Sequence, residues 1–153
     1  MKLRNSSSIS LGPLATLLWL LAFAVAAEAK DLQFQAYLVW AADAQKSPDP
    51  THKPVDSEVR RKLHELPLKW ANFFEVSRVS LTVAEGKSGT TSLSDHCRVE
   101  VTDVNGKNVE VSLIGKGAPV LKRIQPLPKG EMLVLGGNAP DSTGWLVVLK
   151  RTE

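Results

Sequence analysis

The amino-acid sequence predicts a mainly β fold, either an antiparallel β-sandwich or a small barrel of about seven strands, with one short amphipathic helix. Apolar and polar residues alternate with a period of two along several short runs, and glycine, proline and asparagine separate these runs. An Asn105-Gly106 pair lies between two such runs, which is typical of a tight hairpin. One segment alone carries apolar residues at helical spacing.

The first 29 residues have the features of a secretory signal peptide. Lys2 and Arg4 precede an apolar run over residues 14–27, and small residues at Ala27 and Ala29 predict cleavage before Lys30. The run has 14 residues, fewer than the roughly 20 that span a bilayer, so an uncleaved anchor is the alternative and not the first choice. We therefore expect a signal peptide over 1–29, one β-rich domain over 30–153 and no membrane span after cleavage.

The composition of residues 30–153 agrees with export. Cys97 is the only cysteine, so no disulfide forms within the chain, and no Asn-x-Ser/Thr acceptor occurs after the signal. The predicted location is the periplasm of a bacterium or the extracellular medium.

The first strand covers residues 32–40, where Leu32, Phe34 and the following even-numbered residues form one apolar face. The pattern disappears over residues 43–55, which contain three prolines and predict a long surface loop.

The helix follows this loop. Val55, Val59 and Leu63 recur at helical spacing, Asp56 or Ser57 can cap the first turn, and Pro67 ends the helix.

The remaining chain predicts strands. Residues 73–83 form the second, with a slip in the alternation near Ser77-Arg78 that predicts a bulge, and residues 85–91 form a turn. Residues 97–101 and 109–113 form the hairpin, for which a two-residue turn needs a positive φ at both Asn105 and Gly106. The last three strands are expected over 120–125, 132–135 and 145–150, the final two apolar on both faces as in central strands.

Several chemistries are excluded by local sequence. The net charge is +3, and the densest basic cluster, residues 60–62, lies between Glu58 and Glu65, so nucleic-acid binding is not predicted. Gly86-Lys87-Ser88 lacks the first glycine of a phosphate loop, and no helical pattern follows it, so no nucleotide is expected.

Histidine and cysteine give no catalytic or metal-binding set. His52, His64 and His96 lie far apart in sequence, and His96 and Cys97 point to opposite faces of a strand. Cys97 shares its face with Val99, which predicts a buried, inert thiol. We predict no catalytic residue, no metal and no cofactor.

Aromatic residues are the candidate binding residues: Tyr37, Trp40 and Trp70. Trp40, at a strand end beside the proline-rich loop, is the best candidate for exposure. Packing beneath the helix is the alternative for Trp70, and Trp145 lies in an apolar run that predicts a core position.

One resemblance adds to these patterns. Lys69-Trp70 precedes Phe73-Phe74 directly after the helix, and the run from Lys129 to Gly137 precedes a last strand ending in Lys150-Arg151. With these features residues 63–150 resemble small exported bacterial proteins of no assigned activity. The resemblance implies a helix followed by antiparallel strands, and it implies no functional residue.

Because no catalytic set is visible, the leading hypothesis is a non-catalytic envelope or extracellular module that binds another protein, for example along a free sheet edge. The first alternative is a carbohydrate- or small-ligand-binding β domain, which would require Tyr37, Trp40 and Trp70 to share one exposed face. The second alternative is a small secreted hydrolase, which would require a histidine beside Asp or Glu in a cleft.

Overall fold

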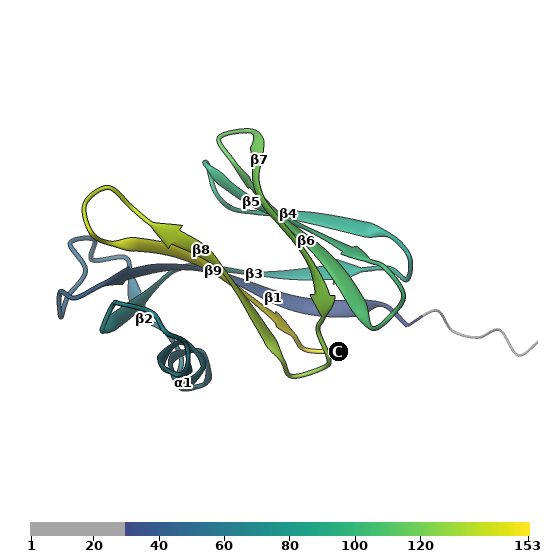
Figure 1. The fold of residues 1–153 in the computed structure, drawn as a ribbon, viewed down its shortest axis with the longest axis horizontal. Helices are drawn as coiled ribbons and strands as arrows, with labels where there is room; N and C mark the ends of the chain where they lie inside the picture. Colours follow the sequence, from purple (N-terminus) through teal and green to yellow (C-terminus); the bar gives the residue numbers. More distant parts are fainter. Residues whose placement is uncertain (1–29) are drawn as a thin grey trace, which may run out of the picture.

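The computed structural model describes residues 30–153, and the signal peptide expected over 1–29 lies outside the described residues. The predicted fold class is confirmed: the described chain is mainly β, with two antiparallel sheets and one short helix, and the sheets form a sandwich and not a closed barrel (Figure 1).

The larger sheet has five strands in the order β2-β3-β1-β9-β8. Their bounds are β1 Leu32–Ala42, β2 Lys53–Pro54, β3 Asn72–Val83, β8 Met132–Asn138 and β9 Gly144–Arg151. The smaller sheet has the order β4-β5-β6-β7, with bounds β4 Ser88–Ser94, β5 Cys97–Asp103, β6 Asn108–Gly115 and β7 Ala118–Pro126. The helix α1 is Ser57–Glu65.

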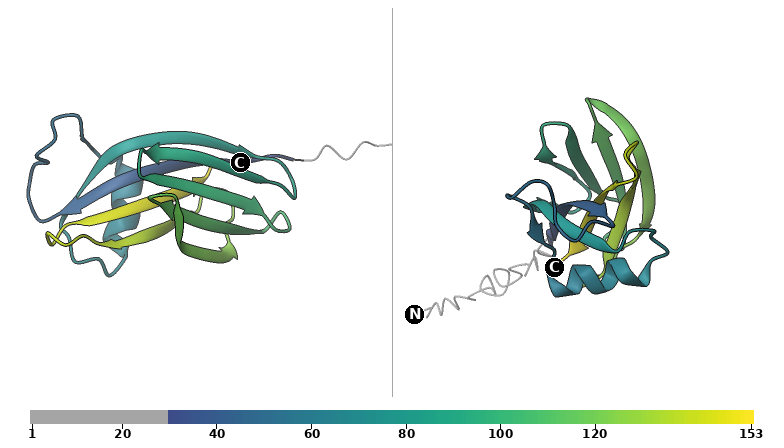
Figure 2. Two further views of the ribbon diagram at one scale, coloured as in Figure 1. Left: turned by 90° about the horizontal axis from the view of Figure 1, so that it is seen from above. Right: turned by 90° about the vertical axis from the view of Figure 1, so that its left-hand side faces the viewer.

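Three layers result from this arrangement. Helix α1 covers one face of the five-stranded sheet, and the four-stranded sheet packs on the other (Figures 1 and 2). Alternation along β1 supplies both faces, because Phe34 and Leu38 pack between the sheets whereas Tyr37 and Val39 pack toward Val59 and the helix. Each face of the larger sheet therefore has its own apolar core.

The helix begins as the sequence predicts. Asp56 is the N-cap, and its Oδ1 accepts a hydrogen bond from the Val59 backbone N–H at 2.9 Å. Val59 and Leu63 are buried against the sheet, so the amphipathic pattern matches the packing.

Two strands are absent from the sequence prediction. Strand β2, inside the expected loop, pairs only Lys53 and Pro54 with β3. Strand β4 is an edge strand with Ser, Thr and Gly on both faces, and Leu93 is its one buried residue. Such a segment has no apolar alternation, so its first residues were expected in a turn.

The irregularity expected in β3 is present one residue earlier than predicted. Leu38 pairs with Ser77 whereas Val39 pairs with Glu75, so Val76 is the extra residue of a bulge.

The β5–β6 hairpin is confirmed, but the predicted turn type is wrong. Gly106 has a φ of 74°, whereas Asn105 has no positive φ. The Asp103 carboxylate accepts a hydrogen bond from the Gly106 N–H at 2.6 Å, and the Asn105 side chain accepts one from Asn108 N–H at 2.8 Å. These side-chain acceptors satisfy the N–H groups of a longer loop, so a primed turn is not required.

Candidate functional site

A cavity of about 820 Å³ lies where the two sheets diverge. Figure 1 shows β7 rising away from the β8–β9 hairpin at this end of the molecule. The wall from the five-stranded sheet is apolar and consists mainly of Leu38, Val76, Trp145 and Val147. The opposite wall is also apolar and consists mainly of Leu113, Val120 and Leu121.

Alternate residues of β1 and β9 form one apolar face that extends from the core into this cavity. Leu38 pairs with Val147, one step along the ladder from the fully buried pair Ala36 and Leu149. The next step on the same face pairs Trp40 with Trp145. The cavity is therefore the continuation of the core beyond the point where the second sheet covers it closely.

Two bulges aim side chains into the cavity. Val76 is the extra residue of β3, as described above. In β7, Leu121 pairs with Leu113 and Pro119 pairs with Ile114, so Val120 is the extra residue of a second bulge. Both extra residues line the cavity. Bulges are common beside functional sites, where they redirect a side chain.

Glycine keeps the β8 side of the cavity free of side chains. Gly136 and Gly137 both line it. Gly136 has a φ of 150°, and a Cβ there would overlap the carbonyl oxygen of Trp145 on the neighbouring strand. Position 136 therefore requires glycine, and β8 presents backbone to the cavity at this point.

Polar side chains in the cavity lining come from the two turns at its edge. Ser94 and His96 belong to the β4–β5 connection, and Lys116 belongs to the β6–β7 turn. The Lys116 backbone N–H donates to the His96 carbonyl at 3.1 Å, which ties the two turns together. Among residues 30–153, no buried side-chain nitrogen or oxygen lacks a hydrogen-bond partner. The described cavity therefore offers a ligand apolar contact inside and polar groups at its rim.

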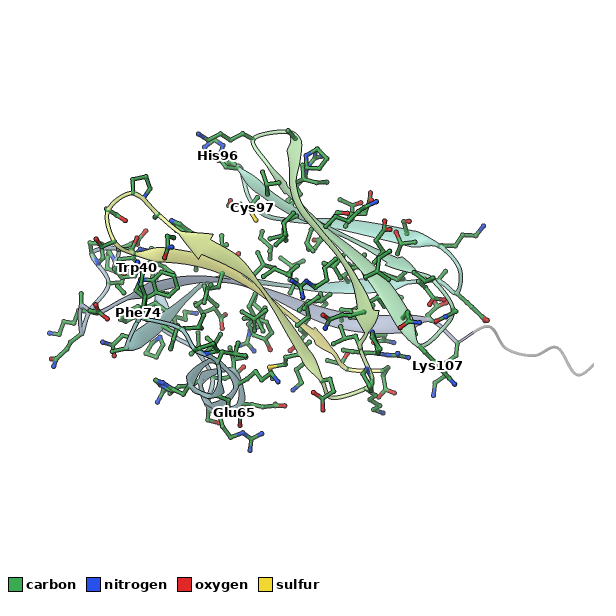
Figure 3. The ribbon with its side chains drawn as sticks, in the orientation of Figure 1. Trp40, Glu65, Phe74, His96, Cys97 and Lys107 are labelled. Atoms are coloured by element: carbon green, nitrogen blue, oxygen red, sulfur yellow. The ribbon has the colours of Figure 1, made fainter. Side chains whose placement is uncertain are left out.

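Cys97 lies on the cavity wall below His96 (Figure 3). It shares the inward face of β5 with Val99, as predicted, but it is only partly buried. Burial raises the pKa of its thiol. The thiol is therefore held in its neutral form to higher pH than a free cysteine.

The three predicted binding residues do not share an exposed face. Tyr37, Trp40 and Trp70 are 1%, 9% and 7% exposed. Tyr37 and Trp70 belong to the helix-side core, where Trp70 donates from its Nε1 to the Ser142 carbonyl at 2.8 Å. The packing alternative for Trp70 is therefore the observed one.

The expected exposure of Trp40 is wrong. The proline-rich loop folds back over this end of the sheet and places the His52 ring 6.2 Å from the Trp40 ring, and Phe74 lies 5.6 Å away on the other strand. Trp40 and Phe74 lie near each other at the left of Figure 3. A role for these buried residues in binding stays a prediction.

The expected core position of Trp145 is also wrong, because its side chain is 43% exposed. Trp145 lies on the inner face of β9, where the smaller sheet has already diverged. The sequence of an apolar strand is the same whether or not a second sheet covers it. The apolar run around Trp145 therefore does not predict that this side chain is exposed. The neighbouring Gly136-Gly137 pair is the one sequence feature that marks the site.

The histidines lie in three separate places. His64, on α1, contacts the Phe73 ring edge-on at 5.4 Å, and His96 lines the cavity. His52 bonds through Nδ1 to Ser47 Oγ at 2.7 Å and lies 3.5 Å from the Asp49 carboxylate. In the described chain, no group of three or more His, Cys, Asp and Glu residues could hold a metal ion.

The Ser47, Asp49 and His52 cluster fastens its own loop. Asp49 Oδ1 accepts bonds from both the N–H and the hydroxyl of Thr51, and Ser47 Oγ accepts one from the Asp49 N–H. The cluster does not belong to the cavity lining. Its geometry is that of a turn, and it supports the loop over Trp40.

Comparison with protein-family models, with curated proteins and with solved structures finds no match for this chain. The resemblance to small exported bacterial proteins therefore stays a prediction. Within residues 30–153, no helix is both long enough and apolar enough to cross a membrane.

Proposed function

We propose that this protein is a non-catalytic binding domain that holds an elongated apolar ligand, such as a single acyl chain, between its two sheets. The observation that carries the proposal is the inter-sheet cavity of about 820 Å³ with apolar walls on both sides. Ligand sites in proteins have volumes of about 300–1,000 Å³ and are lined mainly by apolar and aromatic side chains.

The distribution of polar groups favours an acyl chain over a carbohydrate. A sugar needs hydrogen-bond partners for several hydroxyl groups, and a buried hydroxyl without one costs about 1–3 kcal/mol. The cavity lining supplies polar side chains at its edge, from Ser94, His96 and Lys116. Its interior contacts suit methylene groups, each of which contributes about 0.8 kcal/mol when buried.

Export to the periplasm or the medium, and binding to another protein, stay predictions from the sequence. The mass of the exported product tests export, since cleavage before Lys30 gives one defined value.

A fluorescence titration tests the proposal. N-phenyl-1-naphthylamine is an uncharged apolar fluorophore, and we expect its emission to rise saturably with the protein and to fall when a saturated fatty acid competes. Val120→Glu places a charge in the cavity wall at a side chain that is 66% exposed, and it should weaken binding at least tenfold.

Val104→Glu is the matched control, because Val104 is 50% exposed and lies outside the cavity lining. Its affinity should equal that of the unmodified protein, and circular dichroism melting checks that both variants are folded. An equal loss of affinity in the two variants, or no saturable binding at all, would contradict the proposal.

A further inference from the structure

We propose that the cavity opens onto an anionic phospholipid membrane surface, and that strand β7, the turn at Lys116 and Trp145 form the docking face. We call these residues the mouth face. The inference rests on the proposed function, because a membrane is where a domain that holds an acyl chain would take up or release it.

Exposed apolar side chains gather at the mouth face. Five large hydrophobic residues of the described chain are notably exposed, and Val104 is the only one outside this face. The other four, with their exposed fractions, are Val120 at 66%, Leu121 at 37% and Trp145 at 43%, which line the cavity, and Ile124 at 59%. Ile124 pairs with Glu110 and lies on the opposite side of β7 from Leu121, so this edge strand exposes apolar side chains on both of its sides. Exposed apolar residues concentrated along one edge in this way indicate an interaction surface.

The positive charge of the mouth face favours an anionic membrane as the partner. Residues 116–126 contain Lys116, Lys122 and Arg123 and no acidic residue. Glu110 on the neighbouring strand pairs with Lys122 at 2.8 Å, so Lys116 and Arg123 supply most of the excess positive charge. Basic residues beside exposed apolar side chains match the anionic headgroups and acyl boundary of a bilayer.

A second copy of the chain fits this edge less well. Strand β7 is an edge strand, and all its residues except Gln125 are exposed. Antiparallel pairing of two copies about the strand centre would place Lys122 opposite Lys122, with Arg123 beside them. Like charges directly opposite each other destabilise a strand pair.

The mouth face is continuous with the cavity. Val120, Leu121 and Trp145 are exposed to solvent and also line the cavity wall. Tryptophan is enriched at membrane interfaces, where its ring lies at headgroup level. An acyl chain could therefore pass from a bilayer to the cavity along an apolar path.

Co-sedimentation with lipid vesicles tests this inference. We expect the protein to bind vesicles of phosphatidylcholine with 30% phosphatidylglycerol, to lose this binding at high salt, and to bind phosphatidylcholine vesicles weakly. Replacing both charges, Lys122→Gln with Arg123→Gln, should weaken vesicle binding at least fivefold. Replacing Ile124 by Ser, outside the cavity lining, should weaken it as well.

Matched variants serve as controls. Arg60→Gln with Arg61→Gln removes two charges from exposed positions on α1, on the far side of the larger sheet (Figure 1), and Val104→Ser removes an exposed side chain elsewhere. Both should bind vesicles like the unmodified protein. Equal losses in test and control variants, or no preference for anionic vesicles, would overturn the inference.

The fluorophore titration separates this inference from the proposed function. The Lys122 and Arg123 variant should bind N-phenyl-1-naphthylamine within about twofold of the unmodified affinity, because neither side chain lines the cavity. Vesicle binding without fluorophore binding would refute the proposed function alone. A dimer that the same variant converts to monomer, with no vesicle binding, would overturn the membrane inference in favour of a protein partner.

Discussion

At the scale of the residue, two tryptophans show that the sheet face on which a side chain lies does not determine how much of it is exposed. Trp40 and Trp145 pair across β1 and β9 and lie on the same face of the sheet, yet they are 9% and 43% exposed. The alternation of the sequence predicts the face of each. Their exposure depends on the loop that carries His52 over Trp40 and on the divergence of the smaller sheet near Trp145, and both are tertiary.

Cys97 allows a test at this scale, because its partly buried thiol lies on the cavity wall and burial raises its pKa. At pH 8 a smaller fraction of this thiol is ionised than of a free cysteine, so iodoacetamide should react with it more slowly. A saturating fatty acid should slow the reaction further. The modified fraction is measured by mass spectrometry over time.

The same reaction in guanidinium chloride is the control, and there Cys97 should react at the rate of a free cysteine with or without the fatty acid. Equal rates for the folded protein with and without ligand would contradict a ligand in this cavity.

At the scale of the element, strands and the helix follow from sequence wherever one face is buried. The even residues of β1 and the helical spacing of Val59 and Leu63 are examples. Strand β4 cannot be predicted in this way, because Ser, Gly and Thr occupy both faces of this edge strand and give no apolar alternation. It is recognised only from its antiparallel pairing with β5. The bulge at Val120 was missed as well, because it depends on the register with β6.

The two adjacent glycines of β8 give a matched pair of variants. Gly136→Ala would place a methyl group against the Trp145 carbonyl in a backbone conformation that alanine rarely adopts, whereas a Cβ at Gly137 meets nothing within 4 Å. We expect Gly136→Ala to lower the free energy of unfolding by about 1–3 kcal/mol. Gly137→Ala should change it by less than about 0.5 kcal/mol. Urea denaturation measures both, and equal effects would show that β8 does not approach β9 this closely.

The helix cap is a second test of an element. Asp56 accepts the Val59 N–H and also lies 3.1 Å from Arg78 on β3. Asp56→Ala should cost about 1 kcal/mol of stability in thermal or urea unfolding. Asp56→Asn retains the cap and loses only an exposed ion pair, so it should cost less than about 0.5 kcal/mol. Equal losses in the two variants would mean that the charge and not the cap stabilises this junction.

At the scale of the whole molecule, the fold class could be predicted and the site could not. The mainly β sandwich follows from the alternating runs and their turns. The cavity requires residues from β1, β3 and β9 to face residues from β6 and β7, and no local motif encodes the divergence of two sheets. The sequence predicts Tyr37, Trp40 and Trp70 as binding residues, but all three are buried and pack inside the protein. It predicts a core position for Trp145, which is exposed.

Isothermal titration calorimetry with a series of saturated fatty acids tests the central proposal most directly. If the chain lies between the sheets, each added methylene group should tighten binding by about 0.8 kcal/mol, or about fourfold, until the cavity is filled. The heat-capacity change should be negative, as for burial of apolar surface. Affinity that does not depend on chain length, or the absence of binding heat at several temperatures together with no fluorophore displacement, would contradict an apolar ligand in this cavity.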